Sequence, residues 1–436
     1  MKYKHTAFYS IIIYLVSVLW LRFFAGYIFT FQHDHEPVFL FTREYILTQL
    51  TLPGGLSELM ARFIMQFYVN PWLGAGVLSL MVMLLLLFAW QLTKHHIGIT
   101  LLFWVVVLAF ITIPTGNIAI LVALYVVIKT LAGEQKFQSP AGIWLFRFIA
   151  VPLLLWIAGS WVWFYVICVS LRHILQTRKM SGVVAGFLGA SLLFALLSYR
   201  FLWVISPHVF FLGLFPFDSL IGIILIFTTL LIIFYSTLPK FSHKNVTIIF
   251  SAIAGIVLIV ITVINLTNPQ RTTERWREYL KTEHYSDVIA EAKKTRDLNR
   301  IQTLYVNYAL AKDDQLFDTM FSFPQMYGTN GLLPNPHRGI TTRNIDEFWF
   351  IGEFYYEIGY FDKAYRIACD QLVFHGVTPY YTKLMIKCLL AEGHINSANK
   401  YLYLMEHTLF HRKWAQRYRA ITHDQNMYLK EFASVR

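Results

Sequence analysis

Residues 246–266 read VTIIFSAIAGIVLIVITVINL, and a sequence of a different kind follows them. The stretch carries no charge and is long enough for a helix that crosses a bilayer, which needs about 20 apolar residues. From Arg271 to the end the chain has 22 Lys and Arg and 19 Asp and Glu, whereas the first 270 residues have only 15 and 6. The sequence therefore predicts a polytopic membrane domain over residues 1–267 and a domain of ordinary soluble composition over residues 268–436.

The composition of the whole chain agrees with this division. The mean hydropathy is +0.51, and only 14% of the 436 residues are charged, against about 25% in soluble domains. A wholly soluble protein is thus excluded. An aromatic content of 17% and only three cysteines exclude a disordered chain and a disulfide scaffold. We interpret the net charge of +12 as a signal of membrane topology and expect no nucleic-acid partner.

Apolar runs typical of membrane spans recur through the first domain. They cover residues 8–31, 72–92, 97–113, 117–130, 141–158, 160–171, 182–199, 220–238 and 246–266. The third and fourth runs are short and could form one span, and so could the fifth and sixth. With nine spans and the N-terminus inside, ten Lys and Arg lie in inner segments and three lie outside, as the positive-inside rule requires. We therefore expect an all-α protein of about nine spans in a bacterial inner membrane, with its C-terminal domain in the periplasm.

The N-terminal run could be a cleavable signal peptide or a retained anchor. It is longer than a typical signal-peptide core, and no small-residue cleavage site follows it. We interpret it as a retained signal anchor that forms the first span.

Acidic residues are rare in the membrane domain and are concentrated in the first outer loop, residues 32–71. The loop holds Asp34, Glu36, Glu44 and Glu58. Asp34 and Glu36 alternate with His33 and His35, and two carboxylates so placed can bind a hard divalent cation such as Mg²⁺ or Mn²⁺, or act as a general base. Zinc bound by the histidines is a weaker alternative. The remaining alternative is a solvated loop that keeps the outer face polar.

A second outer segment, residues 200–218, is apolar but broken by proline and glycine. Arg200 and His208 are candidates for binding the phosphate of a membrane lipid, because guanidinium and phosphate pair well. Asp218 and, in the first outer loop, Arg43 complete the predicted substrate-binding set. Alternatively, Arg200 only anchors its span at the head groups.

The first span, the Asp34-x-Glu36 pair and the amphipathic stretch after it resemble the GT-C glycosyltransferases, which use a polyprenyl-phosphate sugar at the outer leaflet. The resemblance covers mainly residues 8–93. It implies that Asp34 is the base or orients the acceptor, and that Glu36 helps to bind a divalent metal. The chain as a whole also resembles an uncharacterised bacterial family of polytopic membrane proteins with helical-repeat tails, through residues 323–333 and 408–415. That family has no established activity.

The C-terminal domain contains an internal repeat. Residues 357–364, EIGYFDKA, recur as residues 391–398, AEGHINSA, so that Gly359 and Ala364 align with Gly393 and Ala398. This pattern resembles tetratricopeptide helix pairs, which stack into a solenoid whose concave face binds a protein or peptide. The alternative is a cap packed over the membrane domain. Cys369 and Cys388 could form a disulfide or remain buried thiols.

These features leave several classes of function open. The chain has no phosphate loop, no dinucleotide fingerprint and no HExxH motif. The first hypothesis is a GT-C-like transferase that moves a sugar from a polyprenyl-phosphate donor, with Asp34 as base. The alternative is a membrane-anchored repeat-domain scaffold for an envelope protein complex, without catalysis. A transporter is a third possibility.

Overall fold

The computed structural model describes residues 2–93, 96–112, 117–134, 136–179, 181–203, 206–213, 216, 219–235, 243–333 and 345–432. The protein is helical throughout this part of the chain, and no strand occurs in it. The chain divides into two compact units. The membrane unit comprises Met1–Ile28 and Phe41–Asn265, and the tail unit comprises Phe29–Leu40 and Leu266–Arg436.

The membrane unit is built of long apolar helices joined by short connections. Its helices are α1 (Lys2–Phe24), the start of α2 (Gly26–His35), α3 (Arg43–Leu50), α4 (Gly55–Met65), the 3-10 turn η1 (Gln66–Val69), α5 (Pro71–Leu92), α6 (Ile97–Ile111), α7 (Ile118–Glu134), α8 (Pro140–Ala158), α9 (Trp161–Thr177), α10 (Gly182–Phe201), α11 (Pro207–Leu212), α12 (Leu220–Phe234) and most of α13 (His243–Thr267).

Four helices in the described part are long and apolar enough to cross a membrane: α5, α8, α10 and residues 247–267 of α13. A fifth candidate is the pair α1 and α2, which covers the first predicted span but is bent by 73° between Phe24 and Gly26. Helices α6 and α12 are apolar but shorter. The structure therefore has several helices that could span a membrane, and the count of nine stays a prediction.

Buried polar contacts hold the helices of the membrane unit together. The indole of Trp20 on α1 donates to the hydroxyl of Thr262 on α13 at 2.9 Å, and Trp104 on α6 donates to Ser17 on α1 at 2.9 Å. Arg147 on α8 is 6% exposed and pairs with Glu134 at the end of α7, with 3.0 Å between its Nε and the carboxylate. Arg147 is thus satisfied inside the unit, where an unpaired charge would be costly.

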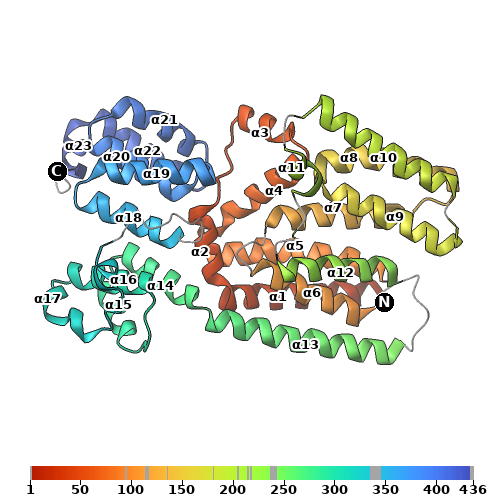
Figure 1. The fold of residues 1–436 in the computed structure, drawn as a ribbon, viewed down its shortest axis with the longest axis horizontal. Helices are drawn as coiled ribbons and strands as arrows, with labels where there is room; N and C mark the ends of the chain where they lie inside the picture. The colour runs from red at the N-terminus through yellow and green to blue at the C-terminus, as the bar shows by residue number, and fades with distance from the viewer. Residues whose placement is uncertain are drawn as a thin grey trace. The chain divides into compact units, whose positions relative to one another are not determined.

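The tail unit is a series of short helices, each packed on the next. They are α14 (Pro269–Lys281), α15 (Tyr285–Ala292), α16 (Arg300–Lys312), α17 (Leu316–Thr319), the 3-10 turns η3 (Met320–Ser322) and η4 (Gly328–Gly331), α18 (Ile345–Glu357), α19 (Phe361–His375), α20 (Pro379–Ala391), α21 (Ile395–Glu406), α22 (Arg412–His423) and α23 (Gln425–Phe432). Figure 1 shows α18 to α23, in light to dark blue, as one group of neighbouring helices.

Four of the turns between these helices have the same geometry. Each first helix ends in one residue with left-handed backbone conformation, and the next amide donates to the carbonyl five residues earlier at 2.7–2.9 Å. The left-handed residues are Glu283 (φ 61°), Asp314 (φ 54°), Gly359 (φ 79°) and Gly393 (φ 83°). This is the Schellman arrangement, which satisfies carbonyls at a helix end. It joins α14 to α15, α16 to α17, α18 to α19 and α20 to α21.

The residues of the predicted repeat occupy matching positions. Gly359 and Gly393 both have positive φ, and Ala364 and Ala398 are both fully buried where successive helices pack. Cys369, Cys388 and Cys168 are free thiols. The tetratricopeptide-like and solenoid assignments remain predictions.

Residues 29–40 belong to the tail unit, although 225 residues separate Leu40 from Leu266 along the chain. The amide of Val38 donates to the carbonyl of Val377 at 2.8 Å, and Val38, Phe39 and Leu40 are buried. The hydropathy pattern does not indicate this grouping, because these residues follow the first apolar run directly. The start of the predicted outer loop is therefore a structural part of the tail unit.

We expect Gly393→Ala to destabilise the tail unit by about 1 kcal/mol and Glu283→Gly to stabilise it by about 0.5 kcal/mol. A left-handed conformation costs a residue with a Cβ roughly 1–2 kcal/mol, which Gly393 avoids and Glu283 bears, while glycine also raises the entropy of the unfolded chain. No atom lies within 4 Å of a Cβ at position 393, so backbone strain alone is tested. The measurement is thermal unfolding of the full chain in detergent, followed by tryptophan fluorescence.

The control for this pair is Gly255→Ala. Gly255 lies in the middle of α13, it does not have a positive φ, and no atom lies within 4 Å of an added Cβ. That variant should not be destabilised. An unchanged unfolding midpoint in Gly393→Ala would contradict the assigned turn geometry.

Candidate functional site

The tail unit has a pocket of about 390 Å³ that opens to the surface, which we call the tail pocket. Its wall comes mainly from α14, α16, α18, α20 and α22, together with the end of α2. Charged and aromatic side chains dominate the lining: His33, Asp34, Lys281, Glu283, Tyr285, Tyr308, Trp349, Glu353, Glu357, Tyr380, Lys383, Lys387 and Trp414. A cavity of this size and composition suits a small polar ligand.

Asp34 lies in the wall of the tail pocket and is held by two cations of α14. Lys281 forms a close ion pair with Asp34 Oδ2, and Arg277 NH2 lies 3.5 Å from the same oxygen. Arg277 is 1% exposed and also pairs with Glu274 at 2.5 Å. Burial raises the pKa of Asp34, but Lys281 and Arg277 outweigh this effect and hold the pKa well below its usual range. The carboxylate is therefore ionised and neutralised, which makes it a weak base.

Histidines surround this ion-pair network. The ring of His33 lies 5.2 Å from that of His411, and His35 Nδ1 lies 2.8 Å from the carbonyl oxygen of Phe31. Burial lowers the pKa of His33 to about 4 and that of His35 to about 3, and it also lowers the pKa of His411. Nearby cations, Lys383 for His33 and Arg277 for His35, act in the same direction. All three rings are consequently neutral at pH 7.

Lys383 and Lys387 form a pair of like charges on one face of α20. They are four residues apart, so both side chains reach the tail pocket, and like charges at this spacing repel each other. Within the described residues neither lysine forms an ion pair. Lys383 lies 5.4 Å from the ring centre of Trp414, and Lys387 lies 5.6 Å from that of Tyr356. Burial lowers the pKa of Lys383 to about 8; the charge of Asp34 opposes this shift, and the charges of Lys387 and Lys281 add to it.

The carboxylates of α18 are already engaged. Glu353 accepts a hydrogen bond from the hydroxyl of Tyr380 at 2.8 Å, and Glu357 forms a close ion pair with Lys312. In the described part of the chain, Lys383 and Lys387 of the pocket wall thus form no ion pair, whereas Glu353 and Glu357 are each engaged with another side chain. This distribution makes Lys383 and Lys387 the positions where an anionic group of a ligand is best accommodated.

The chain matches a family model over nearly its whole length. Residues 2–434 match the model of a family of unknown function, DUF6057. The chain belongs to this family. No curated protein and no solved structure matches it. The resemblance of the sequence to an uncharacterised family is confirmed to that extent.

The tail pocket of this DUF6057 member contains one of the predicted site residues. Asp34 lines it, whereas Glu36 is exposed just beyond α2 in the same unit. Arg43, the first residue of α3, and Arg200, in the last turn of α10, are exposed residues of the membrane unit. His208 lies in α11 with a side chain outside the described part, and Asp218 lies outside the described residues. The other members of the predicted substrate-binding set thus belong to the membrane unit or lie outside the described residues, and their assembly with Asp34 stays a prediction.

The metal prediction has no further support in the described residues. No group of three or more His, Cys, Asp or Glu side chains in that part of the chain is arranged to hold a metal ion. Asp34 Oδ2, one of the proposed ligand atoms, is paired with Lys281 and Arg277. A divalent cation at Asp34 and Glu36 stays a prediction.

Sequence reasoning missed the cations of the pocket. Lys281, Lys383 and Lys387 come from two helices that are more than 100 residues apart in the chain, and each is unremarkable in a domain with many lysines. The spacing of Lys383 and Lys387, four residues apart in a helix next to the repeated glycine, was the signal available. A spacing of four residues places both lysines on one face of α20, and this face lines the tail pocket.

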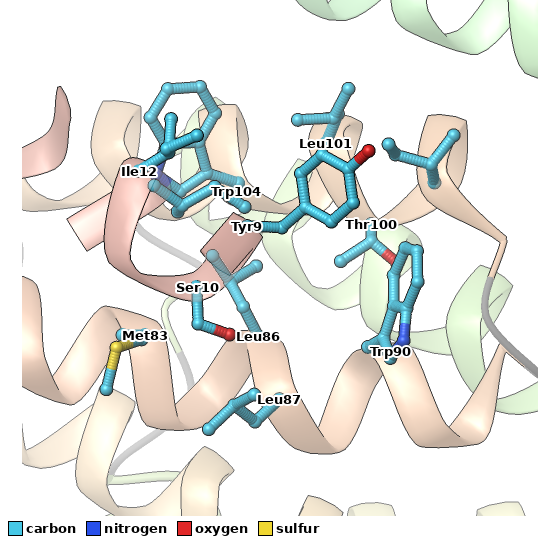
Figure 2. Close-up of a pocket in the computed structure, with 12 residues that line it drawn as sticks. Tyr9, Ser10, Ile12, Met83, Leu86, Leu87, Trp90, Thr100, Leu101 and Trp104 are labelled. Carbon is cyan, nitrogen blue, oxygen red and sulfur yellow. The ribbon is translucent and has the colours of Figure 1, made fainter. Parts of the chain in front are cut away.

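The membrane unit has a cavity of a different kind, of about 150 Å³. Figure 2 shows Tyr9 and Ile12 of α1, Leu86 and Trp90 of α5 and other side chains of α1, α5 and α6 around it. The lining is almost entirely apolar, which suits an apolar occupant and provides no charged group for catalysis.

Proposed function

We propose that this DUF6057 protein is a membrane-anchored binding protein, whose tail unit lies in the periplasm of a bacterium and captures a ligand in the tail pocket without transforming it. The apolar helices of the membrane unit anchor the chain in the inner membrane. The tail unit acts as a tetratricopeptide-like scaffold that presents the pocket to the envelope. This proposal shares the absence of catalysis with the scaffold alternative, but its partner is a ligand in the pocket and not a protein complex.

The observation that supports it is the pair Lys383 and Lys387. Two lysines on one helix face, without ion-pair partners in the described part of the chain, destabilise an empty pocket and favour one that holds an anion. Trp414 beside Lys383 and Tyr308 elsewhere in the pocket wall provide apolar contact area for the rest of the ligand. Such a combination of convergent charges and aromatic faces is typical of binding sites.

The lowered pKa and the ion pairs of Asp34 also favour ligand binding over glycosyl transfer. A general base needs a pKa near the working pH and access to the proton that it removes. The pKa of Asp34 is lowered, and its oxygen is engaged with Lys281 and Arg277. We interpret Asp34 as the residue that ties α2 to α14 and shapes the pocket wall.

Glycosyl transfer from a polyprenyl-phosphate sugar is the second candidate. One observation favours it: Asp34, the acid that the GT-C resemblance implies, lines a cavity of ligand size. In that case the ion pair with Lys281 would open when substrate binds, and Arg43, Arg200, His208 and Asp218 would have to contribute to donor binding.

The test of binding uses a photo-crosslinking residue at Tyr285, a half-buried aromatic residue of the pocket lining. The modified full-length chain is expressed in a strain that lacks the wild-type copy, and adducts are identified by mass spectrometry after irradiation. We expect one adduct that disappears in Lys383→Met and persists in Lys400→Met, since Lys400 is exposed on α21. The same crosslinker at Tyr403, which is 51% exposed outside the pocket, should not give this adduct.

The two candidates differ in the response to Asp34→Asn. The binding proposal predicts that surface glycans and lipid-linked sugars are the same in cells with Asp34→Asn and with wild type, provided that both proteins accumulate equally. A surface glycan that wild type restores and Asp34→Asn does not would favour transfer. Crosslinking that is independent of Lys383, together with such a loss, would refute the binding proposal.

A further inference from the structure

The tail pocket contains charges of both signs, and this limits the ligand that fits it. Three lysines, Lys281, Lys383 and Lys387, line it together with four carboxylates, Asp34, Glu283, Glu353 and Glu357. A ligand with many negative charges, such as an acidic peptide, would meet repulsion from these carboxylates. A ligand with one anionic group and several hydroxyl groups would not, because hydroxyls donate to carboxylates and accept from lysines.

The two free lysines give the position of the anionic group. Lys383 and Lys387 come from successive turns of α20 and lack ion-pair partners in the described part of the chain, whereas Lys281 is neutralised by Asp34. An anion between them would relieve the repulsion of the pair and form charge-assisted hydrogen bonds. Among the described residues no arginine lines the pocket, so recognition there is by two point charges and not by one planar guanidinium.

Aromatic rings flank this position and give the shape of the rest of the ligand. Trp414 lies beside Lys383, with 5.4 Å between the ammonium and the ring centre, and Tyr308 lies farther along the wall, 5.4 Å from Phe350. Aromatic faces carry partial negative charge, and they attract the weakly positive C–H groups on the face of a sugar ring. The volume of about 390 Å³ is near the lower end for small-molecule sites, so the bound part of the ligand is small.

We propose that the tail pocket binds an acidic sugar residue, whose carboxylate or phosphate lies between Lys383 and Lys387 and whose ring packs against Trp414. The hydroxyl groups of the sugar reach Glu353 and the other polar groups of the wall. This inference rests on the proposed binding role of the pocket and adds the chemical class of the ligand. Uronic acids and sugar phosphates share the required chemistry.

The test is isothermal titration of the full chain in nanodiscs of neutral lipid. The probes are a glucuronic-acid oligosaccharide, glucose 1-phosphate, glucose as the neutral match, and a short Asp- and Glu-rich peptide. We expect saturable binding of at least one acidic sugar, with glucose at least tenfold weaker. Lys383→Met and Lys387→Met should each weaken binding at least tenfold, as expected for loss of a hydrogen bond to a charged group. Which acidic sugar binds distinguishes a uronate from a phosphate ligand.

Two control variants separate the pocket from the rest of the chain. Lys400→Met removes an exposed charge of α21 and should bind as wild type does. Trp414→Phe keeps an aromatic ring and should bind within a few-fold of wild type, whereas Trp414→Ala should lose at least tenfold. Each variant is first checked for an unchanged unfolding midpoint, so that loss of fold is not read as loss of contact.

Other outcomes overturn the inference in distinguishable ways. Binding of the acidic peptide but of no sugar, with the same dependence on Lys383, would refute the ligand class and leave the binding role intact. Equal binding of glucose and of acidic sugars would refute the role of the lysine pair. If no probe binds while Tyr285 still gives a Lys383-dependent adduct in cells, the ligand class is wrong and the proposed function stands. Absence of both signals refutes both.

Discussion

Arg277→Met is expected to destabilise the tail unit by about 3–5 kcal/mol, a typical cost of breaking a buried ion pair on one side. Arg277 is 1% exposed, and its guanidinium lies 2.5 Å from Glu274, which is equally buried, and 3.5 Å from Asp34. It also lies 5.9 Å from the ring centre of Trp349. The substitution would leave Glu274 charged in the interior without its closest cation, and it would remove one of the two cations that hold Asp34.

Thermal unfolding of the full chain in nanodiscs measures this effect. A domain of this size loses about 2–4 °C per kcal/mol, so the tail-unit transition should fall by roughly 10 °C. The matched control is Arg417→Met. Arg417 pairs with Glu431 at 3.0 Å, but its side chain is 63% exposed, and exposed pairs contribute between about 0 and 1 kcal/mol.

A second variant tests whether the lost stability comes from the unpaired carboxylate. The double variant Arg277→Met, Glu274→Met replaces both charges of the close pair by apolar groups. For a buried ion pair such a replacement often leaves the stability unchanged. We expect the double variant to recover most of the loss. A midpoint in Arg277→Met equal to that in Arg417→Met would contradict the network around Asp34.

Local features of the fold could be predicted from the sequence because they depend on neighbouring residues. The run 246–266 lies within α13 (His243–Thr267), since an uninterrupted apolar stretch has few alternatives to a helix. The repeat aligns Gly359 with Gly393, and both have positive φ in the structure. The equivalent turns at Glu283 and Asp314 were missed, because a residue with a side chain gives no signal for a left-handed conformation.

The candidate site could be predicted only in part because its contacts are distant in sequence. Asp34 was selected for its position after the first apolar run, but its partner Lys281 is 247 residues away. No single-sequence pattern encodes such a pairing. The base role expected for Asp34 rested on its place in the first outer loop and on the GT-C resemblance, whereas the structure places Asp34 in a neutralised pair. Lys383 and Lys387 can be recognised as candidate binding residues only when it is known that α2, α14 and α20 line one pocket.

Acidification from pH 7 to pH 5 is expected to destabilise the tail unit by several kcal/mol. His33, His35 and His411 have pKa values lowered mainly by burial, to about 4 for His33 and about 3 for His35. In the unfolded chain their pKa is about 6.5. Between pH 6.5 and 4 the unfolded state therefore binds protons that the folded state does not, and stability falls as pH falls. Each histidine contributes at most about 1.4 kcal/mol per pH unit.

The other charged groups beside these rings do not titrate in this window. The pKa of Asp34 is lowered from an ordinary value of 3.8, so the stability that its ion pairs contribute is present above that pH and is lost only below it. Lys383, with a pKa lowered to about 8, is protonated in both states below pH 7. The charge of Lys281, and for His35 also that of Arg277, lowers the histidine pKa values, whereas the charge of Asp34 raises them. The slope between pH 6.5 and 4 in the tail unit is therefore assigned mainly to the three histidines, with a smaller contribution from His375, whose pKa burial also lowers.

Unfolding midpoints of the full chain at half-unit steps from pH 7.5 to 4.5 test this assignment. The variant His33→Gln, His35→Gln and His411→Gln should show a much flatter dependence than wild type, since glutamine has a similar polarity and does not titrate. His394→Gln is the matched control, because the side chain of His394 is 63% exposed on the same unit. If the triple variant retains the wild-type slope, the histidines are not buried as neutral rings. The close packing of His33, His35 and His411 with Asp34 and α14 would then be wrong, and with it the shape of the pocket wall on which the ligand proposal depends.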